Sequence, residues 1–407
     1  MNKTSPLFKK IRDIGPRIFY GFALLFTVVS LLLWFLIYGP HGTDIQIIGF
    51  SSIFSWHAHE MIYGYALAVA SGFLLVVEKP GEYYSRSSNN LFLINLGSWL
   101  VARFAAFSNE NIFKILLFFN IIFCFLLFYS VTKRIFKNTK LYQLRALPYV
   151  LFLFLSIEIC FYLAETGTMY FNSISLIHMA IYLLVFLIMM IGGRVLPAVV
   201  EGNALYFNKK FKIIKSNSTL YKINILLLPI FFILILVSAD DKYLQAISII
   251  ILVSNFVRIF NIYSPIIWNN FLILGLYVAT FYILLGVFLR GFQGYFELMP
   301  SLHLHAFAYG GIGIMTATMM SRIIIGFSSG NTKNPDTFIN ISIGILMVGA
   351  FIRVVLPIFD PDSYYIYILL AQVFWIVSFS LLSIKLIPLL LKGRQIEPIS
   401  PLKKERV

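Results

Sequence analysis

The sequence predicts an all-α protein, a polytopic transmembrane helical bundle of about twelve helices in a single domain over residues 1–407. Three observations lead to this prediction. Of the 407 residues, 59% are hydrophobic and only 12% are charged, which a water-exposed surface does not tolerate. Apolar runs of about 18 residues or more recur from residue 18 almost to the C-terminus. No polar stretch between them is long enough to fold as a separate soluble domain.

Short connectors rich in Gly, Pro, Asn and Asp divide the apolar runs. In such connectors, including 39–42 and 360–362, the backbone can meet water instead of hydrocarbon. A helix needs about 20 apolar residues to cross the membrane. On this basis we predict helices near 18–38, 56–77, 90–108, 111–131, 146–165, 173–197, 221–239, 243–260, 267–289, 301–325, 338–358 and 363–388.

The positions of Lys and Arg predict the orientation. The net charge of +15 is concentrated in alternate connectors between the apolar runs, which is typical of membrane topology and not of nucleic-acid binding. Cytoplasmic loops are enriched in Lys and Arg, so we expect both termini in the cytoplasm. Besides the N-terminal tail, the basic connectors contain Lys133, Arg134, Lys137, Lys140 and Arg145, then Lys209, Lys210, Lys212 and Lys215, and finally Lys392, Arg394, Lys403, Lys404 and Arg406.

All six histidines map to the predicted outer side. Ionisable residues at membrane depth are costly and therefore indicate function. A lone histidine at the interface, such as His41, is more often a wetted polar residue, but five on three helices predict a set of metal ligands. These are His57 and His59 at the start of the second helix, His178 early in the sixth, and His303 and His305 at the start of the tenth.

The second and tenth predicted helices begin with the same pattern, which indicates a duplicated cofactor-binding helix. An α-helix turns about 100° per residue, so residues two apart point about 200° apart. The two imidazoles of each pair therefore reach different sites, and neutral imidazole is a ligand for both haem iron and copper. The matching segments are His57-x-His59-x3-Tyr63-Gly64 and His303-x-His305-x3-Tyr309-Gly310.

Charged residues near the predicted outer ends of helices complete the candidate site. Arg103, Arg290 and Arg353 are candidate partners for the propionates of a haem. The alternative for each is a side chain that reaches the membrane interface for hydration alone. Glu60 is a candidate hydrogen-bond acceptor for an imidazole or a proton acceptor, and Glu158 is a candidate for a proton path.

At these residues the chain resembles the NnrS family. The resemblance implies a protein of the bacterial cytoplasmic (inner) membrane that takes part in the response to nitric oxide and contains haem, expected to be b-type, and copper. In the family, the segment that here ends in Met319-Met320-x-Arg322 usually continues into Gly-His-Thr-Gly-Arg. This chain has Gly-Phe-Ser-Ser-Gly over 326–330 instead, so any role of that histidine is missing. The segments are Trp56-His57-Ala58-His59-Glu60-Met61-x-Tyr63-Gly64, Gly192-Gly193-Arg194-Val195-x-Pro197, and His305 followed by Gly311-x-Gly313 and Met319-Met320-x-Arg322.

The chain is also similar to the catalytic subunits of haem–copper oxidases and nitric-oxide reductases, which carry histidines on their second, sixth and tenth helices. This resemblance implies that His57 and His305 are the opposite axial ligands of one haem and that His303 binds a second haem. His178 and Tyr182 match the spacing of the copper histidine and the tyrosine of that superfamily.

The copper site of that superfamily also uses a histidine pair on the seventh helix. The corresponding run here, 224–229, has no histidine, so His59 or His41 would have to complete such a site. Tyr182 and Glu60 are the candidate catalytic residues.

Two functions of different classes fit these observations. The first is a haem protein whose metal, near the outer face, binds nitric oxide or a derived nitrosyl species, with or without turning it over. The second is a secondary transporter, since twelve helices, cytoplasmic termini and a repeated helix motif also suit that class. Transporter sites usually lie near the midplane of the membrane, whereas these histidines lie near one face. This difference favours the first function.

Overall fold

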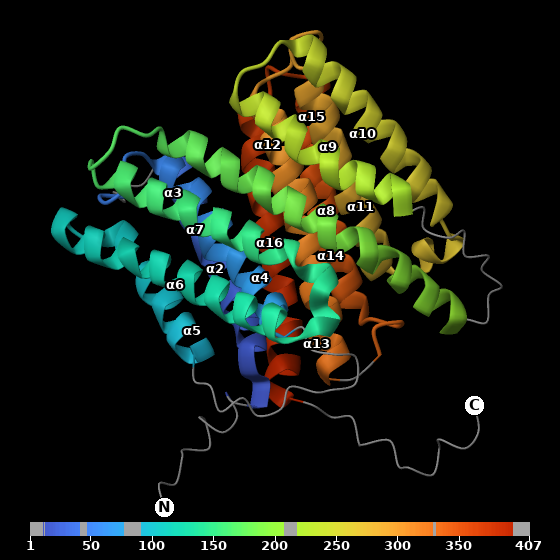
Figure 1. Cartoon of the computed structure of the whole chain (residues 1–407), viewed down its shortest axis with the longest axis horizontal. Coiled ribbons are helices and arrows are strands. Elements are labelled where there is room, and N and C mark those ends of the chain that lie inside the picture. Colours follow the sequence, from blue (N-terminus) through green and yellow to red (C-terminus); the bar gives the residue numbers. More distant parts are fainter. Residues whose placement is uncertain are drawn as a thin grey trace, which may run out of the picture.

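The protein is an all-helical bundle (Figure 1). The computed structural model describes residues 11, 13–40, 47–76, 91–206, 218–328 and 331–393. Over these residues no β-strand is present, and ten helices are long and apolar enough to span a membrane. A helix satisfies its own backbone hydrogen bonds in hydrocarbon, and the protein is an integral membrane protein.

The ten candidate spans follow one another along the chain. They are α2 (Ile18–Tyr38, preceded by the 3-10 turn η1, Gly15–Arg17), α6 (Glu110–Lys137), α7 (Ala146–Glu165), α8 (Ser173–Tyr206), α9 (Ser218–Leu236), α10 (Asp241–Asn261), α11 (Phe271–Gly291), the continuous run of α12 (Ser301–His305), η6 (Ala306–Gly313) and α13 (Ile314–Ser328), α14 (Thr337–Val354) with α15 (Leu356–Phe359), and α16 (Tyr364–Lys392). The 3-10 turn η4 (Thr139–Leu144) connects α6 to α7.

Two further predicted spans are helical but less apolar or shorter. The second predicted helix consists of α3 (Ile53–His59), η2 (Glu60–Ala66) and α4 (Leu67–Leu74), which follow each other without a break. Its two histidines and its glutamate make it less apolar than the ten. The third consists of α5 (Leu91–Ala102) and the 3-10 turn η3 (Ala105–Phe107), which form a shorter apolar helix. The predicted number of twelve depends on these two segments.

Several helix boundaries differ from the predicted ones by a few residues, and two of the differences have identifiable reasons. The helix predicted over 173–197 continues to Tyr206, because the loss of one N–H at Pro197 does not end α8. Near 267, the chain first forms the 3-10 turn η5 (Pro265–Asn269). The side chain of Asn270 then accepts a hydrogen bond from the backbone N–H of Leu272 (2.9 Å), and this cap sets the start of α11.

The first and last spans lie side by side and antiparallel. A Cβ atom on Gly21, near the start of α2, would lie 3.3 Å from Leu390, near the end of α16. At the other end, the Tyr365 hydroxyl of α16 donates to the backbone oxygen of Tyr38 (3.1 Å). The start of α2 and the end of α16 therefore lie at the same end of the bundle. Helices α5 and α6 lie at one edge and α10 at the opposite edge (Figure 1).

Asp336 caps α14 in a connector outside the spans, and its contribution should depend on pH. Its carboxylate accepts a hydrogen bond from the N–H of Phe338 (2.8 Å) and pairs with Lys385 (3.2 Å). The backbone hydrogen bond, aided by the lysine, holds the pKa of Asp336 below its ordinary value of 3.8. A carboxylate whose pKa is lowered by folding stabilises the fold above its unfolded pKa, and this stabilisation is lost as the pH falls through the folded pKa.

We therefore expect Asp336→Ala to lower the free energy of unfolding by about 1 kcal/mol at neutral pH, the usual effect of removing a helix cap. The difference from wild type should shrink as the pH falls below the ordinary pKa of 3.8. Thermal unfolding of both proteins in detergent, at neutral pH and at a pH below 3.8, measures this difference in stability. A difference of the same size at both values would contradict the assignment of the charged carboxylate as the cap.

Candidate functional site

The histidines of the described residues lie at one end of the bundle, which we call the histidine end. This is the end where α2 finishes and where α3, α8, α12 and α16 begin. Ring contacts and hydrogen bonds between helices hold it together, such as the stacking of His57 on Trp34 and the hydrogen bond between Tyr182 and His303. His41 lies outside the described residues.

Both His-x-His segments lead directly into a π-helix. The π-helix η2 follows His59, and η6 follows His305. Tyr63 and Tyr309, at matching positions, are buried and each donates to a backbone carbonyl of a neighbouring helix, at 3.1 and 3.0 Å. Helices of this type are rare and frequently mark functional sites. The similarity of the two helices therefore extends from the sequence to the backbone.

His57 and His305 face a common region of the histidine end. The ring of His57 stacks on Trp34, with centroids 4.2 Å apart, and its Nδ1 is buried without a hydrogen-bond partner in the described residues. The Nδ1–H of His305 donates to the backbone oxygen of Ser301 (2.9 Å), which leaves the lone pair on Nε2, where Arg353 donates (3.0 Å). Arg353 interacts electrostatically with both imidazoles. A histidine whose tautomer is fixed in this way is typical of a metal ligand.

His303 points to the opposite side of α12. Its Nε2 lies 3.3 Å from the Tyr182 hydroxyl of α8, while its Nδ1 is buried and makes no hydrogen bond of good geometry in the part of the chain that the structure describes, although the backbone of Pro300 interacts with the ring. His178, one turn before Tyr182, and Arg290, near the end of α11, interact electrostatically with it. His303 and His305 thus face different helices, as their spacing predicts.

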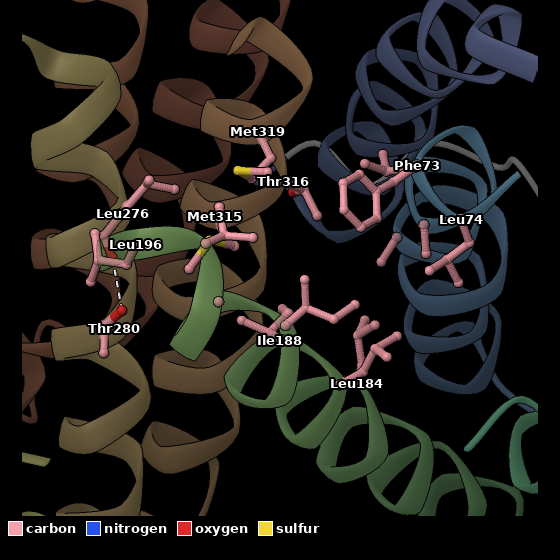
Figure 2. Close-up of a pocket in the computed structure, with 17 residues that line it drawn as sticks. Phe73, Leu74, Leu184, Ile188, Leu196, Leu276, Thr280, Met315, Thr316 and Met319 are labelled. Carbon is pink, nitrogen blue, oxygen red and sulfur yellow. Dashed lines mark hydrogen bonds between the residues drawn. The ribbon is translucent and has the colours of Figure 1, made fainter. Parts of the chain in front are cut away.

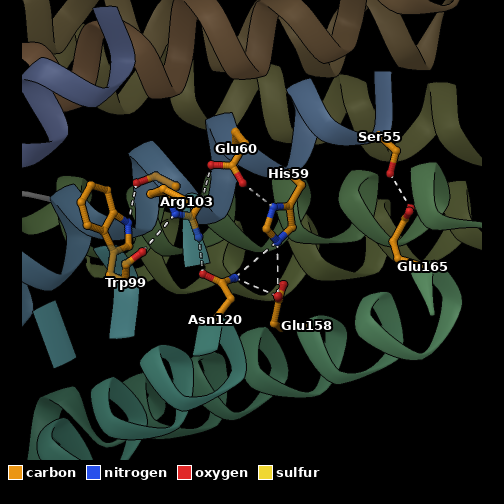
Figure 3. Close-up of polar contacts among 9 residues, drawn as sticks. Ser55, His59, Glu60, Trp99, Arg103, Asn120, Glu158 and Glu165 are labelled. Atoms are coloured by element: carbon orange, nitrogen blue, oxygen red, sulfur yellow. Dashed lines mark hydrogen bonds and ion pairs between the residues drawn. The ribbon is translucent and has the colours of Figure 1, made fainter. Parts of the chain in front are cut away.

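His59 belongs to a group of buried polar side chains that we call the His59 network (Figure 3). Its Nδ1 lies 3.1 Å from a carboxylate oxygen of Glu60, and its Nε2 lies 3.2 Å from Glu158 and 3.3 Å from the amide nitrogen of Asn120. Arg103 completes the network, because its guanidinium pairs with Glu60 and donates to Asn120 (2.5 Å). Both ring nitrogens of His59 are therefore in use.

This network changes the roles that the sequence suggested for two residues. His59 was a candidate metal ligand and Arg103 a candidate partner for a haem propionate, but each would have to leave its buried partners to take that role. Glu60 and Glu158, expected near an imidazole or on a proton path, both contact His59. Asn120 was missed, although an isolated asparagine in an apolar run is a recognisable signal.

Glu165, at the end of α7, fixes the start of the helix that carries His57 and His59 (Figure 3). Its carboxylate accepts hydrogen bonds from the N–H of Ser51 (2.6 Å), from the Ser51 hydroxyl (2.9 Å) and from the Ser55 hydroxyl (2.6 Å). Sequence reasoning missed this residue because it lies at a predicted helix end, where a solvated glutamate is ordinary.

An apolar cavity lies between α4, α8, α11 and α13 (Figure 2). About 740 Å³ in the cavity and at its open side is not filled by protein atoms. Leu184 lines its near end, about 9 Å along α8 from His178 at about 1.5 Å per residue. The hydroxyls of Thr280 and Thr316, in its wall, donate to carbonyl oxygens of their own helices (2.8 and 2.7 Å). The cavity is therefore suited to apolar molecules.

All three histidine-bearing helices contribute to the wall of this cavity. Helix α4 continues the helix of His57, α13 continues the helix of His303, and α8 carries His178. Among the described residues, no group of three or more His, Cys, Asp and Glu side chains is arranged to hold a metal ion. The imidazoles of the histidine end come from three helices and do not form such a group.

These features define an integral membrane protein of helical type with a buried histidine-rich site at one end of the bundle. A family model described as NnrS protein matches residues 10–394, nearly the whole chain, and the chain belongs to the NnrS family. The comparison with curated proteins finds no match.

Proposed function

We propose that this protein binds haem at the histidine end and that the haem iron binds nitric oxide. One observation carries the proposal: imidazoles from three helices lie on the two sides of α12 at the histidine end, and each side has one arginine. Each imidazole has a ring nitrogen that lacks a protein partner or is bonded only to a phenol or a guanidinium. Such nitrogens suit axial ligation of iron, and arginine suits propionates. The residues are His57, His178, His303, His305, Arg290 and Arg353.

Within this site, we propose that His57 and His305 would hold the iron of one haem. They face the same region and share Arg353 as a neighbour, and Ser301 fixes the tautomer that places the lone pair of His305 on Nε2. Arg353 donates to this Nε2 (3.0 Å) and would have to turn from it to a propionate when the haem binds. Haem iron, when bound, supplies the atom that coordinates nitric oxide. His303, on the other side of α12 with His178 nearby, is the proposed ligand of a second haem or of copper.

We propose that twelve segments of the chain cross a bacterial inner membrane. Both termini then lie on the cytoplasmic side, and the histidine end is the outer end. The support is the placement of Lys and Arg together with the antiparallel packing of α2 and α16. The segments α3–η2–α4 and α5–η3 are the two that complete the count.

The apolar cavity is better suited to a small apolar ligand than to the polar solute of a transporter. Its mid-depth position is where a secondary transporter would bind its substrate, but its wall leaves no free hydrogen-bond donor for a polar solute. Nitric oxide is small and apolar and dissolves in lipid. We propose that it reaches the histidine end through this cavity.

The proposal is tested by optical spectra and by iron and copper analysis of protein purified after expression with sufficient haem. We expect a Soret band that shifts when nitric oxide is added without oxygen to the dithionite-reduced protein. Consumption of nitric oxide over several turnovers would add catalysis, with Tyr182 and Glu60 as the first residues to replace. A colourless, metal-free protein would overturn the proposal and leave the transporter as the leading function.

A larger side chain in the cavity should slow the passage of nitric oxide to the haem without reducing the haem content. A Cβ atom on Gly192 would meet only Met315, at 3.9 Å, so Gly192→Leu fits on α8 and projects into the cavity. We expect nitric oxide to rebind several-fold more slowly after flash photolysis, with the Soret band unchanged. Gly202→Leu is the matched control, because a Cβ atom at Gly202 of the same helix meets nothing within 4 Å. Equal rates in the two variants would rule out this route.

A further inference from the structure

The Gly192-Gly193-Arg194 segment of α8 takes no part in the proposed haem site, although it is one of the segments that carry the family resemblance. It lies about 22 Å along α8 from His178, at about 1.5 Å per residue. Its neighbours Tyr221, at the start of α9, and Arg258, near the end of α10, lie toward the end of the bundle opposite the histidines. Tyr221, in the first turn of α9, donates a hydrogen bond to the backbone oxygen of Met190 on α8 (2.7 Å). This bond joins the start of α9 to the middle of α8.

Gly193 allows two side chains to approach the backbone of α8. A Cβ atom at this position would lie 2.7 Å from the ring of Tyr221 and 3.4 Å from Nη1 of Arg258, which belongs to α10. The first distance is too short for any real side chain. Glycine is therefore required here by the close approach of Tyr221, with Arg258 directly beside it.

Two guanidinium groups lie beside the ring of Tyr221. The Cζ atoms of Arg194 and Arg258 are 5.5 and 6.0 Å from its centroid. Arg258 is only 5% exposed, its Nε has no hydrogen-bond partner, and it forms no ion pair with the residues that the structure describes. A buried cation is costly unless an anion accompanies it. The arrangement therefore calls for an anionic ligand with several oxygen acceptors, such as a phosphate group.

The surroundings favour a phosphate that belongs to a lipid. Helix α9 is the least buried of the ten candidate spans, with 22% of its most apolar window buried, and α10 lies at the edge of the bundle (Figure 1). Phe256 and Phe260 of α10 are 71% and 70% exposed, as expected for side chains that face lipid. Each is two residues from Arg258, so they lie on the opposite face of the helix and show only that α10 borders the lipid. The connector from α8 to α9, 207–217, contains four lysines and no acid, so this end of the bundle attracts anionic headgroups.

We propose that Arg258, Arg194 and Tyr221 form a binding site for the phosphate group of an anionic phospholipid. In this site the two guanidinium groups bind the phosphate oxygens, and the lipid-exposed face of α9 contacts the acyl chains. The site lies at the end opposite the histidines and is independent of the haem proposal. It also explains why Gly193 and Arg194 occur together.

The test measures lipid binding and thermal unfolding of the full chain in detergent. Phosphatidylglycerol, phosphatidylcholine and inorganic phosphate are added separately. We expect phosphatidylglycerol alone to raise the unfolding temperature of the wild type and to remain bound in native mass spectra. In Arg258→Gln, phosphatidylglycerol should bind about tenfold more weakly, the effect of losing one charge-assisted hydrogen bond.

Lys242→Gln is the matched control, because it removes the same charge from the other end of α10, where Lys242 pairs with Asp240 (3.0 Å). It should bind phosphatidylglycerol as the wild type does. If Arg258→Gln does not fold, Arg258→Lys and Arg194→Gln test the same site, and both should weaken binding. Equal binding by wild type and Arg258 variants would overturn the proposal. Equal stabilisation by inorganic phosphate would overturn the lipid assignment and indicate a site for a free anion.

Discussion

His57→Ala and His305→Ala are each expected to reduce the haem content of the purified protein about tenfold or more. Each substitution removes one proposed axial ligand, and ligand bonds carry most of the affinity for the iron. The polypeptide itself should remain folded, since neither imidazole forms a buried ion pair with a carboxylate. The ratio of Soret absorbance to protein, measured on monodisperse material, gives the result directly.

The haem content of His59→Ala is the comparison for this prediction. His59 is two residues from His57, but its ring nitrogens contact Glu60 and Glu158, so its loss should affect stability more than haem content. If His57→Ala and His59→Ala lose haem to the same extent, the assignment of the two imidazoles to different sides is wrong. If neither His57→Ala nor His305→Ala loses haem, the ligands lie elsewhere.

The sequence predicted the two-sided placement of the His-x-His pairs because helical geometry alone decides it. Residues two apart on a helix point in nearly opposite directions whatever surrounds them, and His303 and His305 indeed contact α8 and α14 respectively. The π-helices after both pairs could not be predicted in the same way. A single extra residue per turn leaves no clear signature in residue type, although the repeated Tyr-Gly in both segments was visible.

The contacts between distant helices were beyond sequence reasoning. His59 contacts Glu158 and Asn120, which are 99 and 61 residues away in the sequence. These contacts depend on how α3, α6 and α7 pack. Each of these residues looked like an isolated polar position in an apolar run. Only the packing shows that they share one site, in which both ring nitrogens of His59 have protein partners. Its role as a metal ligand stays a prediction.

The second large effect is expected in the His59 network. Arg103→Met should lower the free energy of unfolding by about 3–5 kcal/mol, because it leaves the carboxylate of Glu60 buried without its cation. Glu60 and Arg103 are 4% and 7% exposed at their side chains, so water cannot replace the lost partner. Unfolding by sodium dodecyl sulfate in mixed micelles measures the change. Lys114→Met, which breaks the exposed pair with Glu110 (3.3 Å) on α6, is the control and should cost less than about 1 kcal/mol.

A second substitution distinguishes loss of the ion pair from loss of packing. In the double variant Arg103→Met and Glu60→Gln, the buried carboxylate is replaced by a neutral amide, so no uncompensated charge remains. We therefore expect the double variant to be more stable than Arg103→Met alone, with a coupling free energy of about 1–3 kcal/mol. If the two effects simply add, Arg103 stabilises the fold through its contacts with Trp99 and Asn120 instead. The ion pair between Arg103 and Glu60 would then contribute little to the stability of the fold.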